Sequence, residues 1–258
     1  MQPPIQFIKF PDGNRAKMLE AEPYADAGEV MRALGFTQPT PAIFLSGGAS
    51  AMTEEDMTKT RALVEDGIAR FAADHKIVVI DGGTDTGIMQ MMGRARKAYD
   101  YRFPLIGCAP AGKVKYPGKA GDDNTTATLE PNHSHFVLID GDYWGGESDM
   151  IVGLTRSFAH GVLPACGILI NGGQISQYDV YIASARGKRA VPVIVIDGSG
   201  RTANKIAMES STGNFSSAMI KAIVQGGKLE IITLKAGPDA LYDKLQTAFN
   251  THRPSSTA

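Results

Sequence analysis

Short apolar runs alternate along this chain with longer stretches in which apolar residues recur every three or four positions. The runs have the length of buried strands, and the stretches have the period of helices that cover a sheet. Strands that alternate with helices in this way indicate an α/β fold, in which a mainly parallel, Rossmann-like doubly wound sheet carries helices on both faces. The pattern predicts strands at 42–46, 77–81, 104–109, 135–140, 166–171, 191–196 and 229–234, and helices at 53–73, 87–99, 148–160, 175–186, from about 202, at 215–225 and at 238–249.

The segments outside this alternation have their own patterns. A small β-hairpin is predicted at 5–10 and 16–22, and a short helix follows at 27–34. The stretch from Pro110 to Pro131 shows no clear period, and its length favours a functional loop or lid over a plain connector. The chain thus divides into an N-terminal hairpin and helix at 1–40, a main α/β domain at 41–250 and a tail at 251–258 that is rich in Ser, Thr and Pro and is predicted to be disordered.

Glycine-rich turns follow four of the predicted strands. The carboxyl ends of parallel strands share one edge of the sheet, and ligands bind in the crevice there. Glycine lets the backbone approach an anion closely, and the first N–H groups of the next helix point at it. Tight packing explains any one such turn, but four together predict a cradle for a nucleotide. The candidate binding residues are Ser46, Gly47, Gly48, Gly82, Gly83, Thr84, Thr86, Gly87, Gly172, Gly173, Gln174, Gly198, Ser199, Gly200 and Arg201.

Some of the side chains near these turns allow two interpretations. Thr84 and Thr86 can cap the following helix or bind a phosphate oxygen, since both uses draw on the same N–H groups. His133 and His135 are two residues apart at the start of a strand and are predicted to face the same side. No third ligand with suitable spacing accompanies them, so we predict no metal site and interpret the histidines as structural or ligand-contacting, with His135 as the candidate ligand contact.

Two charged residues are candidates for chemistry. Arg156 lies on a predicted helix whose other side is apolar, where its guanidinium could clamp a phosphate or remain a surface group. Asp179 falls in the first turns of the helix after Gly172-Gly173, and the helix dipole favours a carboxylate there.

The composition limits the classes of partner that the protein can bind. The formal net charge of −1, from 26 basic and 27 acidic residues, gives no overall field for nucleic acid or an anionic membrane. Cys108 and Cys166 sit inside apolar runs, as buried thiols of a reducing compartment do. No apolar run approaches the roughly 18 residues of a membrane span, and no leader-like segment opens the sequence. We therefore expect a cytoplasmic protein whose partner is a small nucleotide.

Three separated motifs, in this order, resemble the SLOG domain of melastatin-type TRP channels and its stand-alone prokaryotic relatives. They are Gly82-Gly83-Thr84-x-x-Gly87-x-Met89, Leu129-x-Pro131-Asn132-His133-Ser134-His135-Phe136 and Asp197-Gly198-Ser199-Gly200-Arg201-x-Ala203, within a similarity from about Pro41 to Phe249. The resemblance implies a Rossmann-like domain that binds a nucleotide-derived ligand, with ADP-ribose and NAD-related metabolites as the leading class. It also implies a homo-oligomer, and no required cofactor.

The wider superfamily includes the Lonely Guy phosphoribohydrolases, whose motif is Pro-Gly-Gly-x-Gly-Thr-x-x-Glu. The matching stretch here runs from Asn171 to Asp179, so that Asp179 replaces the glutamate, Ile175 a glycine and Ser176 the threonine, while Arg156 falls where the family arginine would lie. The resemblance implies an alternative function, an N-glycoside hydrolase in which Arg156 orients the phosphate and Asp179 stabilises the sugar cation. The departures weaken this alternative, because catalytic groups need placement within a fraction of an ångström. A scaffold with a decayed pocket remains a third possibility.

Overall fold

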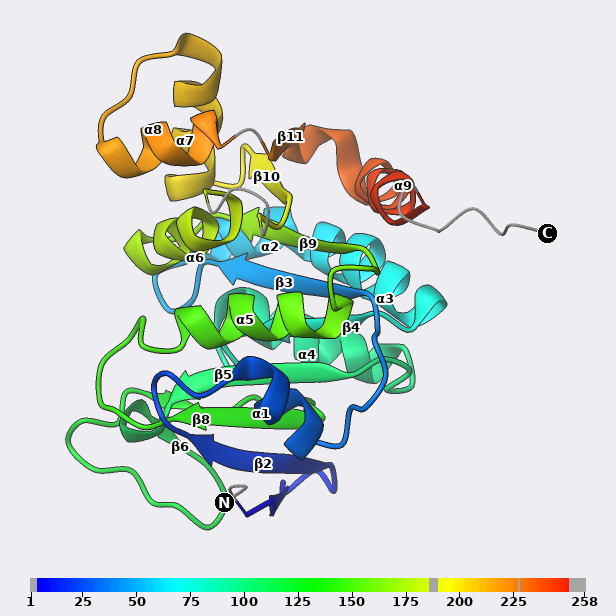
Figure 1. Ribbon diagram of the computed structural model, residues 1–258, viewed down its shortest axis with the longest axis vertical. Coiled ribbons are helices and arrows are strands. Elements are labelled where there is room, and N and C mark those ends of the chain that lie inside the picture. Colours follow the sequence, from blue (N-terminus) through cyan, green and yellow to red (C-terminus); the bar gives the residue numbers. More distant parts are fainter. Residues whose placement is uncertain (1–3, 186–189, 227, 251–258) are drawn as a thin grey trace.

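A nine-stranded sheet forms the centre of the molecule in the computed structural model, which describes residues 4–185, 190–226 and 228–250 (Figure 1). Its strand order is β1-β2-β8-β5-β4-β3-β9-β10-β11, and every neighbouring pair is parallel except β1 and β2. The strands are β1 Gln6–Lys9, β2 Arg15–Ala21, β3 Ala42–Gly47, β4 Val78–Asp81, β5 Leu105–Pro110, β8 His135–Ile139, β9 Ala165–Ile170, β10 Val193–Asp197 and β11 Leu229–Thr233.

Helices cover both faces of the sheet, so the molecule has three layers. The front layer in Figure 1 includes α1, α5 and α6, and α4 lies behind the sheet. The helices are α1 Ala27–Ala33, α2 Glu54–Ala62, α3 Arg70–His75, α4 Gly87–Ala98, α5 Ser148–Ala159, α6 Gln174–Ser184, α7 Arg201–Thr212, α8 Ala218–Gln225 and α9 Gly237–Asn250.

Alternate residues of each central strand feed two different hydrophobic cores. In β3, Ala42 and Phe44 pack in the core beneath α1, α5 and α6, while Ile43 and Leu45 pack in the core beneath α3, α4 and α9. Strands buried on both faces are apolar throughout, which is why the sequence shows short continuous apolar runs. The fold class predicted from these runs is confirmed.

The chain reverses its direction of winding between β3 and β9. From β3 it adds β4, β5 and β8 on one side, and it then returns to place β9, β10 and β11 on the other side. The loops after β3 and β9 therefore diverge to opposite faces, and open α/β sheets bind ligands in the crevice at such a switch point.

Three features differ in detail from the sequence prediction. The N-terminal hairpin forms as expected, but β2 also pairs in parallel with β8 and so extends the central sheet. The helix predicted at 53–73 is interrupted by a π-helical segment at Leu63–Ala69, where Gly67 packs against Pro238 and Leu241 of α9. The loop predicted at 110–131 contains a 3₁₀ turn and two short paired strands, β6 Val114–Lys115 and β7 Ala127–Thr128.

Two further expectations concern the C-terminal tail and membrane-spanning helices. The predicted tail at 251–258 lies outside the described residues. Among the helices in the described ranges, none combines the length and the apolar character needed to cross a lipid bilayer.

Candidate functional site

A cavity of about 300 Å³ opens at the carboxyl edge of the sheet, next to the switch point. It lies between the turns after β3 and β4 and the beginning of α6, and parts of two long loops also contribute to it. Its lining comprises Leu45, Ser46, Gly47, Ala49, Ser50, Gly82, Thr84, Thr86, Met89, Thr126, Ala127, Trp144, Glu147, Ile151, Ile175, Ser176 and Asp179. The volume lies at the lower end of the range for small-molecule sites, about 300–1,000 Å³.

The first two glycine turns come together at this cavity. Ile88 N–H in the first turn of α4 donates to Gly48 O at 3.1 Å, which joins the turn after β3 to the helix after β4. A Cβ on Gly87 would lie 2.2 Å from the same oxygen, so only glycine permits this approach. Thr84 Oγ1 lies 3.2 Å from Thr86 Oγ1, and both side chains face the cavity. The structure therefore brings these predicted residues to one site.

Three helices begin at the cavity without a capping side chain. The N-cap residues are Thr86 for α4, Glu147 for α5 and Gly173 for α6, and none of their side chains bonds to a first-turn N–H group. The first N–H groups of a helix have no partner within the helix. Together with the helix dipoles, they make this end of the cavity favourable for an anion.

Two buried carboxyl groups also line the cavity. Asp179 Oδ2 accepts from Ser46 Oγ at 2.5 Å, while the buried Oδ1 has no hydrogen-bond partner in the part of the chain that the structure describes. Burial raises the pKa of Asp179 to about 6, against the opposing effects of the Ser148 and Ser46 hydroxyl groups. Burial also raises the pKa of Glu147 to about 7, although Gly145 N–H donates to its carboxylate at 2.8 Å.

The charges on the lining are unusual for an anion site. No Lys, Arg or His of the described ranges belongs to the lining, and its two titratable groups are both acidic. An anion in the cavity would therefore have to bind to backbone N–H groups and hydroxyl groups. The unpartnered Asp179 oxygen is suited to a hydrogen-bond donor, such as a sugar hydroxyl.

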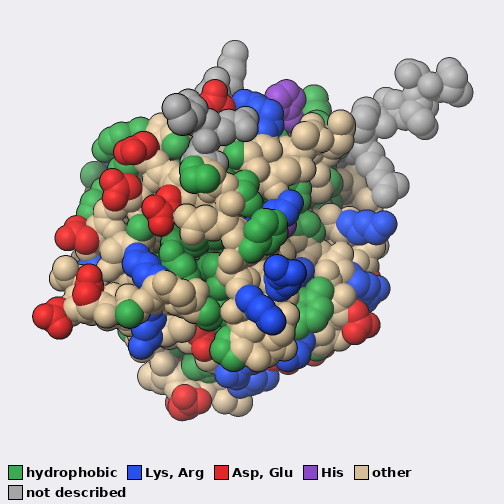
Figure 2. Space-filling model, turned by 90° about the horizontal axis from the view of Figure 1, so that it is seen from below, with side chains coloured by type: hydrophobic (Ala, Val, Ile, Leu, Met, Phe, Trp, Pro, Cys, Tyr) green, Lys and Arg blue, Asp and Glu red, His purple; other side chains and the backbone are tan. Residues whose placement is uncertain are grey.

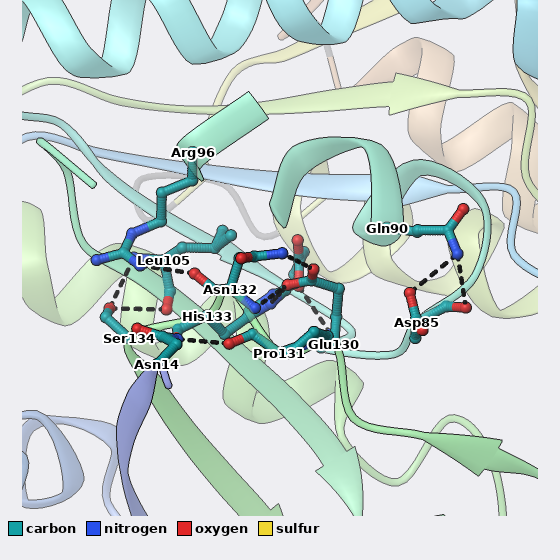
Figure 3. Close-up of polar contacts among 12 residues, drawn as sticks. Asn14, Asp85, Gln90, Arg96, Leu105, Glu130, Pro131, Asn132, His133 and Ser134 are labelled. Carbon is teal, nitrogen blue, oxygen red and sulfur yellow. Dashed lines mark hydrogen bonds and ion pairs between the residues drawn. The ribbon is translucent and has the colours of Figure 1, made fainter. Parts of the chain in front are cut away.

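A buried polar network holds the turn after β4 from behind (Figure 3). Asp81 Oδ1 accepts from Gly83 N–H at 2.7 Å and lies 2.9 Å from His133 Nε2, and His133 Nδ1 lies 2.8 Å from Glu130 Oε2. Burial alone would lower the pKa of His133, but the carboxylates of Asp81 and Glu130 outweigh it and raise the pKa to about 9. The charged His133 therefore holds the Asp81 carboxylate in place, and Asp81 in turn accepts from Gly83 N–H and fixes the backbone of the turn.

The network continues into the loop that precedes β8. Glu130 Oε2 accepts from Asn132 N–H at 2.8 Å, and the buried Arg96 donates to Asn132 O at 2.6 Å. A Cβ on Gly93 of α4 would lie only 1.9 Å from Glu130 Oε2. The second resemblance motif thus supplies structural support for the second glycine turn.

The polar groups of the other two glycine turns, after β9 and β10, form hydrogen bonds with each other. Ser199 Oγ accepts from Asn171 N–H at 2.8 Å and donates to Ile196 O at 2.6 Å, and Asn171 Nδ2 donates to Ser199 O at 2.9 Å. Asn204 Oδ1 accepts from both Gly198 and Gly200 N–H groups. These contacts join the ends of β9 and β10 and leave the turn after β10 outside the cavity lining.

The remaining residues predicted at these turns lie around the cavity rather than in its lining. Gly172 and Gly173 directly precede α6, and Gln174 is the first residue of that helix. The first turn of α6 lines the cavity. The guanidinium of Arg201 lies beside Gly173, since a Cβ there would be 3.2 Å from Arg201 Nη2. Of the four predicted turns, those after β3 and β4 line the cavity directly. The turn after β9 contributes through the start of α6, and the turn after β10 does not contribute.

Arg156 lies at the opposite edge of the sheet from Asp179. Its guanidinium donates to Ile182 O at 2.5 Å, near the C-terminal end of α6, and lines a separate cavity of about 510 Å³ with Lys228 and the start of β9. Helices antiparallel to the strands place their C-terminal ends at the amino edge of the sheet, which accounts for this position. The structure does not bring together the two residues predicted for hydrolysis.

His135 also lies away from the central cavity, at the amino end of β8. It borders an open groove with Phe7, Arg15, Lys17 and Ser134. Seen from below, the surface of the molecule carries Lys, Arg, Asp and Glu side chains around apolar groups, with several Asp and Glu side chains gathered on the left (Figure 2). Burial and the nearby Lys17 lower the pKa of His135 to about 3. The two histidines do not share a side: the His133 ring stacks on Phe136 with centroids 5.3 Å apart, whereas the His135 ring contacts Phe36 at 4.9 Å.

Sequence reasoning missed several lining residues. Glu147 and Trp144 lie in the loop between β8 and α5, and Thr126 and Ala127 come from the loop at 110–131. The predicted functional character of the 110–131 loop was the one available signal for Thr126 and Ala127. No local spacing pointed to Glu147 or Trp144.

Comparison with known proteins finds sequence similarity over most of the chain. Residues 40–243 match the family described as "SLOG in TRPM, prokaryote". The chain is 28% identical over 243 residues to the transient receptor potential cation channel subfamily M member-like 2 of Nematostella vectensis, covering 78% of this chain and 15% of that protein. It is 25% identical over 209 residues to subfamily M member 2 of Rattus norvegicus, covering 67% and 13% respectively. The chain thus spans about a seventh of the length of the curated relatives it matches.

Proposed function

The chain belongs to the SLOG family related to TRPM channels, in its prokaryotic branch, and on this basis we propose that it binds a nucleotide-derived ligand in the central cavity. ADP-ribose or an NAD-related metabolite is the leading ligand class, and the role is that of a binding or sensor domain. The observation that carries the proposal is the cavity at the switch point, lined by the uncapped beginnings of α4, α5 and α6.

The phosphate end of the ligand belongs at these helix starts. Ile88 N–H of α4 and Ser148 N–H of α5 donate to Gly48 O and Gly145 O, so the other first-turn N–H groups would donate to the phosphate oxygens, without a lysine or arginine in the cavity. Thr84, Thr86 and Ser176 add hydroxyl groups to the same wall. No Lys, Arg or His of the described residues lines the cavity. We therefore place any negative charge of the ligand that does not bind to the helix starts near the mouth of the cavity.

The sugar end belongs near Asp179. Its buried Oδ1 has no partner among the described residues, and a buried acceptor without a bond costs about 1–3 kcal/mol. A ribose hydroxyl that donates to this oxygen recovers that cost when the ligand binds. The same group penalises ligands that lack the hydroxyl.

Isothermal titration calorimetry of the full chain against ADP-ribose, NAD and AMP tests the proposal. Ser50 is an exposed lining residue, so Ser50→Trp is expected to obstruct the cavity without disturbing the core. Arg156→Ala is the matched control, since Arg156 lies at the other edge of the sheet. The proposal predicts binding by the wild type and the control and loss of binding in Ser50→Trp. Absence of heat with all three compounds would contradict it.

A further inference from the structure

A second cavity, of about 510 Å³, lies at the amino edge of the sheet, where β9, β10 and β11 begin. We call it the amino-edge cavity, and its volume is within the range of small-molecule sites, about 300–1,000 Å³. Its lining comprises Arg156, Ser157, Ala159, His160, Gly161, Leu163, Ala165, Ala190, Val191, Pro192 and Lys228. None of these residues lines the central cavity, so the two cavities are separate sites.

The ionisable side chains of this lining are all basic. Arg156, His160 and Lys228 belong to it, whereas no Asp or Glu of the described ranges does. α5 and α6 both end at this edge of the sheet, and each helix C-terminus acts as about half a negative charge. The positive charges of Arg156 and Lys228 exceed that sum, which leaves a net charge of about +1 even with His160 counted as neutral. The amino-edge cavity therefore favours a monoanion.

Carbonyl groups at both helix ends already have partners within the protein. Ala159 O of α5 accepts from Leu163 N–H at 2.9 Å, and Ile182 O of α6 accepts from the Arg156 guanidinium at 2.5 Å. Arg156 thus ties α5 to α6 and adds its positive charge to the wall of the cavity.

Lys228 is the cation that can bind an anion directly. Its carbonyl oxygen accepts from Val193 N–H at 2.8 Å, so β10 fixes its backbone, and its Nζ donates to Ala190 O at 2.9 Å. An ammonium group has three donors, and this bond uses one of them. The other donors can form a charge-assisted hydrogen bond with a carboxylate in the cavity.

Much of the remaining wall is apolar. Leu163, Ala165, Val191 and Pro192 contribute side chains without hydrogen-bonding groups. A phosphate ion alone would leave this surface in contact with water, whereas a carboxylic acid with a hydrocarbon chain or ring would cover it. The charge and the apolar wall together fit a carboxylate that has an apolar body.

We propose that the amino-edge cavity is a second ligand site, which binds a small organic carboxylate with an apolar body. The carboxylate accepts from Lys228 Nζ, and its hydrocarbon part lies against Leu163, Ala165 and Val191. The positive charge of Arg156 adds to the attraction. This site is independent of the nucleotide site and gives the protein a second class of ligand.

Titrations of the full chain with hexanoate, benzoate, hexanamide and inorganic phosphate, followed by protein NMR, test the proposal. Hexanoate or benzoate is expected to bind saturably and to shift the backbone amide signals of His160, Gly161 and Lys228. Hexanamide, which lacks the charge, and phosphate, which lacks the apolar body, are expected to bind at least about ten-fold more weakly.

Variants of Lys228 identify the group that binds the carboxylate. Lys228→Met keeps an aliphatic side chain without the ammonium group and is expected to lose about ten-fold of the carboxylate affinity, whereas Lys228→Arg keeps the charge and most of the affinity. Lys221 is an exposed lysine of α8 outside the lining, so Lys221→Met is the matched control and leaves binding unchanged.

The outcomes decide the proposal without reference to the nucleotide. Saturable binding of either carboxylate that Lys228→Met weakens supports it, and the tighter probe shows whether the apolar body is aliphatic or aromatic. Binding of neither carboxylate, tighter binding of phosphate, or an unchanged affinity in Lys228→Met overturns it. Equal affinity of the wild type for hexanoate and hexanamide also overturns it, and this comparison needs no variant. Displacement of hexanoate by AMP would overturn the separation of the two sites, whereas failure of nucleotide binding alone leaves this inference in place.

Discussion

Replacing Asp179 with asparagine is expected to stabilise the protein at neutral pH. Asp179 is 4% exposed, and its buried Oδ1 lacks a partner in the described part of the chain. Asparagine has the same shape and no charge, its carbonyl oxygen can still accept from Ser46 Oγ, and its NH2 group can donate to the neighbouring Ser148 Oγ. The substitution therefore removes the cost of a buried carboxylate while the packing is kept.

The size of the effect follows from the pKa of the carboxyl group. Burial raises this pKa from 3.8 to about 6. A shift of about two units corresponds to ~3 kcal/mol of destabilisation once both states are ionised. Because the folded pKa is raised, the cost is absent below about pH 4, grows as the unfolded state ionises between about pH 4 and 6, and is constant above that. Asp179→Asn should show its full advantage only above about pH 6.

Urea unfolding of wild type and Asp179→Asn at several pH values between 4 and 8 measures this difference. Asp123→Asn changes an exposed carboxylate to the same amide and serves as the control. The reasoning is refuted if Asp179→Asn destabilises the protein at pH 8, or if its effect on the free energy of unfolding is the same at pH 4 and pH 8. Ligand affinity is expected to fall in the same variant, so that stability and binding change in opposite directions.

Three other predictions concern the supports of the site. Gly93→Ala is expected to destabilise the protein by about 2 kcal/mol or more in urea unfolding, although alanine normally favours a helix, because the new Cβ displaces the Glu130 carboxylate; an unchanged free energy would contradict this. The raised pKa of His133 predicts stability that is fully present below about pH 6.5 and is lost as the pH rises through about 9, and His133→Asn should flatten that pH profile. Arg156→Ala is expected to lower the melting temperature, because the guanidinium ties α5 to Ile182 O of α6, and a ligand affinity changed more than two-fold would argue against this purely structural role.

Much of the fold could be predicted because the central strands are buried on both faces. Their apolar runs and the amphipathic period of the helices are local signals, and both survive in the structure with boundaries shifted by at most three residues. The π-helical segment at Leu63–Ala69 could not be predicted, because it depends on contact between Gly67 and α9, about 170 residues later in the chain. The pairing of β2 with β8 is likewise a long-range choice.

The candidate site was predictable as an edge of the sheet but not as a set of side chains. Ser46, Thr84 and Asp179 followed from the rule that parallel strands end at one edge. The same rule could not show that Ser199 and Asn171 bond to each other, or that Arg156 points to the opposite edge. The homo-oligomer, the cytoplasmic location and the ligand implied by the resemblance stay predictions.

A crystal structure of the full chain with ADP-ribose tests the central claim most directly. The account predicts density for the ligand in the 300 Å³ cavity, with a sugar hydroxyl within hydrogen-bond distance of Asp179 Oδ1 and a phosphate at the first turn of α4 or α6. Density instead in the cavity lined by Arg156 and Lys228, or an unliganded central cavity at saturating ADP-ribose, would contradict it.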